Sequence, residues 1–485
     1  MVRMKNVLQI IMSKTLHRHR ALALTATLII LAICPLLFAC NKDKPVYDTS
    51  SCYELDMDLS DDRLDVSQEI LYVSPADSDC LVLHVYANAF SESKDAIDIS
   101  SAQINRKTVD YEIYGKDRTL LKLHYPVSPG QHLNITFKYA ITLPRSNTRL
   151  GITTKGVTNL ACFYPVMAKY ENGWREDEYS SFGDPFYHDI ASFYANLTVD
   201  KDTEVACSGR ITDTRLASEN GRERKTVEIE AEHIRDFALT VGDMRKVSDT
   251  VEIDGKTVDV NYCFFLDPYP SRTLDRIKSA LSVFSETFGA YPYDTFTLAE
   301  TMFDDAGGME YGAFSVVSLC NSIEVYYDTV THETAHQWWY GAVGSDQINS
   351  AWLDEGLTEF CTYYYHYLTG DRARFNEEMA SISRSYSAFS AHKGDVGFNG
   401  EMERPLSSYL TDGEYVAVCY FKGAMLFDTL RGLAGDRKFA LAMQRYFKDN
   451  LFKVATASSL INAFKADGLD VSGIVNAWIK DKNSF

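Results

Sequence analysis

Three features are missing from the 485-residue sequence, and each absence excludes a class of protein. None of the ten cysteines belongs to a CxxC pair, so a zinc site built from cysteines is not expected. No run of about 18 residues after residue 40 is apolar enough to span a bilayer. Positive charge is also scarce, because 48 Lys and Arg face 67 Asp and Glu, for a net charge of −19 at pH 7. This acidic balance argues against nucleic acid as a partner and against adhesion to anionic lipid.

The first 39 residues contain no acidic residue and have the composition of an export signal. Five basic residues precede the apolar run 21–39, an arrangement typical of a cleaved targeting segment. The run ends in Leu37-Phe38-Ala39-Cys40, which resembles the lipobox of bacterial lipoproteins, where the cysteine carries the lipid. We therefore expect residues 1–39 to be a signal peptide and the lipid on Cys40 to be the membrane contact. The rest of the chain would lie outside the cytoplasm, in a bacterial cell envelope. A transmembrane anchor is the alternative.

Loss of the five positive charges of that segment would take the net charge from −19 to −24. The eight cysteines that follow Cys40 are scattered along the chain. Export permits disulfides, and Cys52 with Cys80 could form one. Isolated thiols are the expectation for most of the others.

The sequence changes character near residue 270. From about residue 52 to residue 241, runs of β-branched and aromatic residues alternate with Asn, Asp, Gly and Pro, as in antiparallel sheets. The segment 251–258, with Asp254-Gly255 at its centre, predicts a hairpin. Apolar residues then recur at steps of three and four over 274–288, which predicts a helix. We expect an α+β multidomain fold, with an N-terminal antiparallel β-sandwich or saddle over 40–250 and a mostly helical domain over 251–485.

The strongest chemical signal is the HETAH segment at 332–336. Residues four apart lie on one face of a helix, so His332 and His336 can bind one metal ion. Zinc accepts imidazole nitrogen well, and catalytic zinc sites combine three protein ligands with water. Glu333 would then lie where it can take a proton from water. The alternative for so short a motif is a helix with two unrelated histidines.

A candidate for the third ligand is Glu355, in the WLDEG segment at 352–356. Eighteen residues separate it from His336, including turn residues, and a second helix is expected to begin near Ser350. Two packed helices joined in this way can bring Glu355 to the two histidines. The sequence therefore predicts a site for one Zn²⁺ ion held by His332, His336 and Glu355.

These motifs together resemble those of the gluzincin aminopeptidase family, which includes aminopeptidase N and leukotriene hydrolase. Upstream, Gly307-Gly308-Met309-Glu310-Tyr311 is similar to the family's Gly-x-Met-Glu-Asn motif. Downstream, the YFKG segment at 420–423 is similar to its Tyr-x-Lys-Gly motif. The four motifs occur in the family's order, and the similarity covers roughly residues 190–450. The resemblance implies a thermolysin-like catalytic domain, a zinc cofactor and peptide substrates.

The resemblance also implies roles for individual residues. The Tyr420 hydroxyl would stabilise negative charge in the transition state, beside the general base Glu333. Glu310 would bind the free α-ammonium of the substrate. The backbone from Gly307 through Gly308 and Met309 would run alongside an extended peptide as an added strand. Supporting contacts are expected from Tyr415, Lys422, Asp354 and Glu359.

The sequence departs from the family in three places. Tyr311 replaces the asparagine of the upstream motif. Residues 183–193 occupy roughly the place of a Pro-Cys-Phe-Asp-Glu-Pro-like segment, and no second amine-binding residue can be named there. The sequence ends 65 residues after Tyr420, so we expect no counterpart of the family's C-terminal helical domain, and a more open site.

The leading hypothesis is a zinc aminopeptidase that removes N-terminal residues from peptides outside the cytoplasm. A zinc endopeptidase with an open cleft would use the same metal chemistry and is the nearest alternative. The third hypothesis is an inactive, surface-anchored lipoprotein that binds peptides. Inactive relatives lose a ligand or the base, whereas this sequence keeps all the candidate ligands, Glu333 and Tyr420.

Overall fold

The computed structural model describes residues 51–482 apart from residues 93, 181, 220, 305 and 392–397. The expected signal peptide and Cys40 lie outside the described residues. The described residues belong to one compact unit. No helix in the described part of the chain is both long and apolar enough to cross a membrane.

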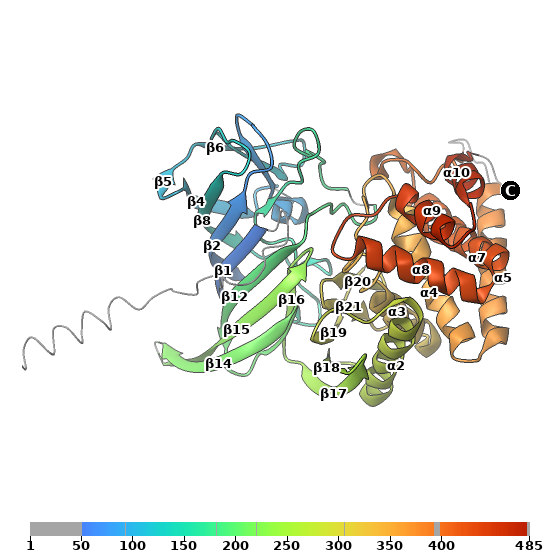
Figure 1. Cartoon of the computed structure of the whole chain (residues 1–485). Helices are drawn as coiled ribbons and strands as arrows, with labels where there is room; N and C mark the ends of the chain where they lie inside the picture. The colour runs from blue at the N-terminus through green and yellow to red at the C-terminus, as the bar shows by residue number, and fades with distance from the viewer. Residues whose placement is uncertain are drawn as a thin grey trace, which may run out of the picture. The chain divides into compact units, whose positions relative to one another are not determined.

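An eight-stranded sheet dominates the described N-terminal residues (Figure 1). Its strand order is β14-β15-β12-β1-β2-β8-β4-β5. Along β12 (Ala191–Asp200), buried residues alternate with less buried ones, because successive side chains of a strand point to opposite faces. The other strands of this sheet are β1 (Ser51–Ser60), β2 (Arg63–Val73), β4 (Ile97–Ile104), β5 (Lys107–Thr108), β8 (His132–Thr142), β14 (Arg210–Glu219) and β15 (Arg222–Ile234).

One strand pair of this sheet differs from the expected antiparallel arrangement. β1 and β12 run parallel, with Ser51 opposite Ala191 and Asp58 opposite Thr198. The other pairs of the sheet are antiparallel. Parallel neighbours need a long connection rather than a tight turn, so no local sequence signal marks their pairing.

Two four-stranded sheets complete the strand-rich region. The first has the order β13-β16-β10-β9 and the second has the order β11-β3-β7-β6. A 3₁₀ helix at Tyr86–Phe90 follows β3. The strands are β3 (Leu81–His84), β6 (Tyr111–Tyr114), β7 (Leu120–Leu123), β9 (Leu150–Ile152), β10 (Thr158–Leu160), β11 (Val166–Met167), β13 (Glu204–Cys207) and β16 (Leu239–Gly242).

A five-stranded sheet of order β17-β18-β19-β21-β20 accompanies the helices. The predicted hairpin is confirmed, because β17 (Arg245–Ile253) pairs with β18 (Lys256–Phe264) across Asp254 and Gly255. Both turn residues have positive φ, 51° and 76°, as a type I′ turn requires. β19 (Thr295–Thr301) and β21 (Phe314–Ser318) form the centre, and β20 (Gly308–Tyr311) is the edge strand.

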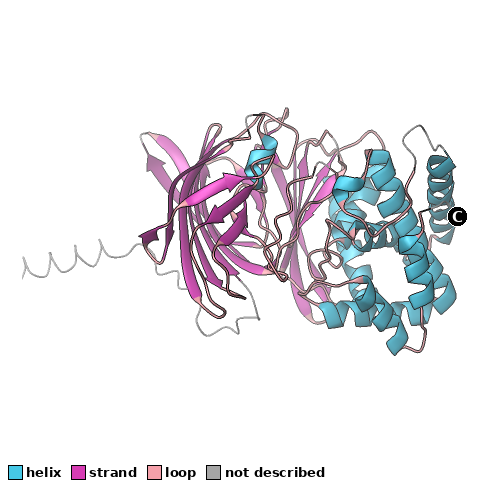
Figure 2. Cartoon of the chain, turned by 90° about the horizontal axis from the view of Figure 1, so that it is seen from above, coloured by secondary structure: helices cyan, strands magenta, loops and turns pink. Residues whose placement is uncertain are grey.

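The predicted helix over 274–288 is confirmed as α2 (Pro270–Phe288). Proline in the first turn favours its start, and Gly289 at φ 134° ends it. Apart from one short helix among the strands, Figure 2 shows the helices gathered on one side. The remaining helices are α3 (Ile323–Ala335), α4 (Glu355–Leu368), α5 (Arg372–Ala391), α6 (Asp412–Tyr415), α7 (Gly423–Ala434), α8 (Asp436–Asn450), α9 (Ala457–Ala466) and α10 (Ser472–Lys480).

The predicted fold class is confirmed: strand-rich N-terminal residues precede a mostly helical region in an α+β chain. Within the described residues, no disulfide joins any of the eight cysteines from Cys52 to Cys419. The conceivable Cys52–Cys80 bridge is therefore not formed. The exact boundary between the two regions near residue 250 stays a prediction.

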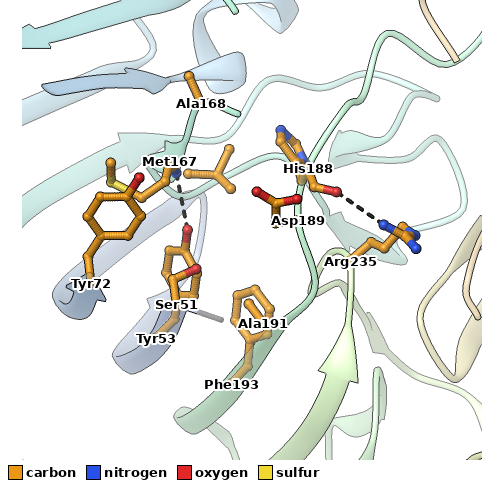
Figure 3. Close-up of a pocket in the computed structure, with 11 residues that line it drawn as sticks. Ser51, Tyr53, Tyr72, Met167, Ala168, His188, Asp189, Ala191, Phe193 and Arg235 are labelled. Carbon is orange, nitrogen blue, oxygen red and sulfur yellow. Dashed lines mark hydrogen bonds between the residues drawn. The ribbon is translucent and has the colours of Figure 1, made fainter. Parts of the chain in front are cut away.

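A small internal cavity of about 20 Å³ lies between β1, β11 and the start of β12, with room for about one water molecule. His188 lines it, and neither ring nitrogen of His188 has a hydrogen-bond partner among the described residues (Figure 3). Its backbone carbonyl accepts a hydrogen bond from Arg235, 3.2 Å away. The ring of His84 lies 6.0 Å from that of His188.

We expect these two histidines to make the fold sensitive to acid. Burial lowers the pKa of His84 to about 4 and that of His188 to about 3. The unfolded chain takes up protons below pH 6.5, whereas the folded chain resists them, so stability falls as the pH drops from 6.5 towards 4. Each histidine would cost on the order of 3 kcal/mol by about pH 4.

His188→Phe should flatten this dependence, because the apolar ring takes up no proton. Midpoints of urea unfolding measured from about pH 7 to about pH 4 would show a shallower slope than in the wild type. His124→Phe, at an exposed position, is the matched control and should keep the wild-type slope. An unchanged slope in His188→Phe would contradict the assignment.

Candidate metal centre

Helix α3 carries the two candidate histidine ligands. Ser322 caps its N-terminus by accepting a hydrogen bond from the amide of Val325 at 3.3 Å. His332 lies in its last turn, and His336 follows directly after it, with its amide bonded to the carbonyl of His332. The two Nε2 atoms are 3.0 Å apart. The helical spacing therefore places both imidazoles on one side, as the sequence predicts.

Glu355, the first residue of α4, brings the third candidate ligand atom. Its Oε2 lies 3.4 Å from the Nε2 of His332 and 3.4 Å from that of His336. The approach depends on the contact of α4 with α7, where a Cβ on Gly356 would lie 2.6 Å from the Cα of Gly423. Only glycine permits so close an approach of two backbones.

The three ligand atoms fit a zinc ion. Tetrahedral zinc with bonds of about 2.0–2.1 Å requires ligand atoms about 3.3–3.4 Å apart. The distances here are 3.0, 3.4 and 3.4 Å. The buried Oε2 of Glu355 also receives no hydrogen bond from any described residue, so its lone pairs are available to a cation. His332, His336 and Glu355 therefore form a site for one zinc ion.

A second group of possible ligands, formed by Glu310, His336 and Asp354, fits a cation less well. Glu310 Oε2 lies 4.0 Å from the Nε2 of His336. Asp354 Oδ1 instead contacts the other nitrogen, Nδ1, at 3.0 Å. These two carboxylates therefore approach different atoms of one imidazole, and Asp354 orients the ring rather than sharing its metal.

His332 has equivalent supporting contacts. Its Nδ1 lies 3.3 Å from Glu359 Oε2 and 3.1 Å from the Thr362 hydroxyl. Burial lowers the pKa of His332. Hydrogen bonds to Glu355 and Glu359 raise it by more than burial lowers it, so the pKa reaches about 9. The expected supporting roles of Asp354 and Glu359 thus have a geometric basis, since each fixes the Nδ1 side of one imidazole and leaves Nε2 facing Glu355.

Glu333 lies beside this group and against the edge strand β20. A Cβ on Gly308 would lie 2.6 Å from the Glu333 carboxyl carbon. The Oε2 atom of Glu333 is buried and has no hydrogen-bond partner among the described residues. Burial raises the pKa of Glu333 to about 7, while His332 and His336 lower it. Gly308 therefore leaves the space that the Glu333 carboxylate occupies.

We expect Gly308→Ala to lower kcat for peptide cleavage by about 100-fold, because a displacement of about 1 Å at a reacting group has this effect. The backbone of Gly308 has no positive φ, so alanine introduces a clash but no backbone strain. Gly432→Ala, on α7, is the control. A Cβ there would meet no heavy atom within 4 Å and should change kcat little. Steady-state kinetics of both variants checks the prediction, and equal activities would contradict it.

Glu310 points into the same buried region. Its side chain is 3% exposed, and burial raises its pKa well above the usual range. Oε1 accepts a hydrogen bond from Gln347 Nε2 at 3.3 Å. No basic side chain among the described residues forms an ion pair with Glu310 apart from the 4.0 Å approach of His336. The outer edge of β20 carries no described strand.

Tyr420 and Lys422 occupy a π-helical turn, Val416–Lys422, which joins α6 to α7. The Tyr420 ring lies parallel to that of His332, at 5.9 Å between centroids. Burial and the nearby Glu355 raise the pKa of Tyr420 well above its usual range, so the hydroxyl remains a donor. Lys422 instead donates to the carbonyls of Gly400 and Asp481, at 2.8 and 3.0 Å, and anchors the C-terminal segment.

Asp184 is a buried carboxylate of this region that the sequence does not single out. It forms an ion pair with Arg149, which also donates to the Tyr179 hydroxyl at 3.0 Å and to the sulfur of Met309 at 3.1 Å. Burial raises the pKa of Asp184 to about 7, Arg149 lowers it, and Glu355 raises it further. The strand-rich region thus places the Asp184 carboxylate close enough to Glu355 to affect its own pKa. No local sequence motif predicts this arrangement.

Residues 272–478 match the Peptidase family M1 domain. Aminopeptidase N of Lactobacillus helveticus is 23% identical over 430 residues, which cover 82% of this chain and 47% of that protein. Aminopeptidase M1-B of Oryza sativa subsp. japonica is 23% identical over 252 residues, which cover 50% and 26%. The chain spans less than half the length of these two relatives.

Solved structures share the fold over most of their length. The M1 zinc metallopeptidase from Deinococcus radiodurans superimposes with a TM-score of 0.67 over 90% of this chain and 94% of that chain, at 18% identity. A two-domain M1 zinc metallopeptidase mutant bound to L-arginine gives a TM-score of 0.68 over 90% and 94%, at 19% identity. At this identity the likeness establishes the fold alone.

Proposed function

We propose that the protein is a zinc-dependent aminopeptidase that removes N-terminal residues from peptides. One observation carries the proposal: the Nε2 atoms of His332 and His336 and the Oε2 of Glu355 lie 3.0–3.4 Å from one another, with Glu333 alongside. Zinc, when bound, supplies a Lewis acid that activates water and stabilises negative charge. The match of residues 272–478 to the Peptidase family M1 domain supports the same chemistry.

Glu333, Tyr420 and the edge strand β20 have separate roles in the reaction. Glu333 takes a proton from the attacking water and passes it to the leaving amine. The Tyr420 hydroxyl donates a hydrogen bond to the carbonyl oxygen as that oxygen gains negative charge. The free edge of β20, from Gly308 to Met309, pairs with the extended substrate backbone.

Glu310 supports the assignment as an exopeptidase. A buried carboxylate without a basic partner is costly, and the α-ammonium of a peptide offsets that cost by ion pairing. Asp184, which is paired with Arg149, lies close enough for its charge to raise the pKa of Glu310. A blocked N-terminus would bring no compensating positive charge.

Paired substrates test this assignment. The wild type should cleave a free-amine peptide with a kcat/KM at least about 100-fold above that of its N-acetylated twin, because the blocked substrate leaves a buried charge unpaired. Glu310→Gln should reduce this preference by lowering cleavage of the free-amine peptide alone. Equal cleavage of both peptides by the wild type would favour the endopeptidase. Stoichiometric zinc without turnover on a broad peptide library would favour an inactive peptide-binding protein.

We also propose that the protein is exported and anchored in a bacterial cell envelope through a lipid on Cys40. The support is the sequence alone: basic residues before the apolar run 21–39, and the LFAC segment at its end. Metabolic labelling with a palmitate analogue should label the wild type but not Cys40→Ala. Equal labelling of both, or an uncleaved segment 1–39 in mass spectra of the purified protein, would overturn the proposal.

A further inference from the structure

The hydroxyl of Tyr415 is a buried polar group without a partner among the described residues. Tyr415 is 5% exposed, and its hydroxyl forms no hydrogen bond with any of them. Its ring packs edge-on against Tyr420 at 5.8 Å and against Tyr409 at 5.4 Å. A buried hydroxyl normally has a hydrogen-bond partner, so its presence here calls for an explanation.

The π-helical turn explains why the rings of Tyr415 and Tyr420 lie together. Tyr415 immediately precedes the turn Val416–Lys422, and Tyr420 lies within it. Residues five apart diverge around an α-helix, whereas the i→i+5 bonds of a π-helix bring them one above the other. Such turns are rare and concentrate at functional sites. The turn therefore presents the rings of Tyr415 and Tyr420 on one side.

Gly183, from the strand-rich region, packs against the phenol of Tyr415. A Cβ on Gly183 would lie 2.6 Å from the Cζ atom of Tyr415, and Gly183 has a φ of 59°. Gly183 precedes Asp184, the carboxylate held by Arg149. Glycine at this position lets the backbone pass against the phenol, directly before Asp184.

The surroundings keep this hydroxyl protonated. Burial, followed by the charge of Glu355, raises the pKa of Tyr415 well above its usual range, and Asp184 adds to the effect. A phenol with its ordinary pKa of about 10 is protonated at neutral pH, so both hydroxyls, of Tyr415 and Tyr420, are donors there.

We propose that the Tyr415 hydroxyl is a second hydrogen-bond donor to the substrate oxygen that gains negative charge during peptide hydrolysis, acting beside Tyr420. The inference rests on the proposed peptidase function and makes Tyr415 a catalytic residue rather than a packing residue. It accounts for the unpaired hydroxyl, because the acceptor arrives with the substrate. It also accounts for the π-helical turn, which brings Tyr415 against Tyr420, and for Gly183, which leaves room for the phenol.

Tyr415→Phe tests the proposal, since it removes one oxygen and keeps the ring. Loss of a single donor to a developing oxyanion typically lowers kcat by about 100- to 1000-fold. Because Tyr420 shares the task, we expect a loss of about 10- to 100-fold in kcat with little change in KM. Tyr386→Phe is the matched control: Tyr386 also has a buried hydroxyl without a partner among the described residues, but it lies on α5 against Phe398.

A second measurement separates catalysis from packing. A phosphinic peptide analogue, which mimics the tetrahedral transition state, should bind Tyr415→Phe about 10- to 100-fold more weakly, whereas the amino-acid product should bind as in the wild type. Unchanged kcat and unchanged affinity for the analogue in Tyr415→Phe, with activity lost in Tyr420→Phe, would overturn the role of Tyr415 alone. Absence of any turnover by the zinc-loaded wild type would overturn the peptidase function and this inference together.

Discussion

Glu333→Gln should lower kcat for peptide cleavage by about 10²–10⁴-fold, the usual contribution of a general base. Glutamine has nearly the shape of glutamate, so it fits the space beside Gly308, but it cannot accept a proton from water. The zinc ligands are untouched, and zinc content measured by mass spectrometry should stay near one ion per chain. KM should change little, because the carboxylate acts on the attacking water rather than on the bound peptide.

The control for this prediction lies on the same helix. Glu324, in the exposed first turn of α3, tolerates the same replacement without contact to the metal centre. Glu324→Gln should therefore keep wild-type kcat and zinc content. Retained turnover in Glu333→Gln, at full zinc occupancy, would show that another group accepts the proton.

Local patterns in the sequence account for the parts of the molecule that neighbouring residues determine. The apolar spacing over 274–288 predicts α2, and Asp254-Gly255 predicts the turn between β17 and β18. The four-residue step from His332 to His336 likewise follows from helix geometry alone. In each case the signal and the structure lie within a short stretch of chain.

Contacts between distant residues could not be predicted in this way. Glu355 reaches the histidines because Gly356 packs on Gly423, and these two glycines are far apart in the sequence. The ion pair of Arg149 with Asp184 joins two irregular segments that have no period of their own. Packing in three dimensions, rather than propensity, decides such contacts, so they become visible only in the folded chain.

Tyr420 is a site residue that residue patterns alone do not identify. Thirty tyrosines occur in the sequence, and the residue pattern alone does not distinguish this one from a packed aromatic. The resemblance of the YFKG segment to a family motif singles it out, and the structure stacks its ring parallel to His332. The position of Lys422, two residues after Tyr420, makes it a candidate for a supporting contact at the site, whereas its ammonium binds the backbone carbonyls of Gly400 and Asp481.

Glu355→Gln should reduce zinc affinity more than Glu359→Gln does, and the two variants form a matched pair on α4. Glu355 supplies one of the three ligand atoms, whereas Glu359 contacts only the Nδ1 of His332, at 3.3 Å. Loss of a contact that orients a ligand typically costs about 10- to 100-fold in metal affinity, so Glu359→Gln should fall in that range. Loss of the ligand itself should exceed about 100-fold, because an amide oxygen carries no charge to pair with the cation.

Competition with a chromophoric chelator measures both affinities directly, without reference to catalysis. Zinc-dependent stabilisation gives a second reading, since a ligand that binds only the folded state raises the unfolding temperature in proportion to the logarithm of its affinity. The wild type and Glu359→Gln should both gain stability on zinc addition, and Glu355→Gln should gain little at the same concentration. Equal affinities in the two variants would mean that Glu355 does not touch the ion, and the proposed site would lose its third ligand.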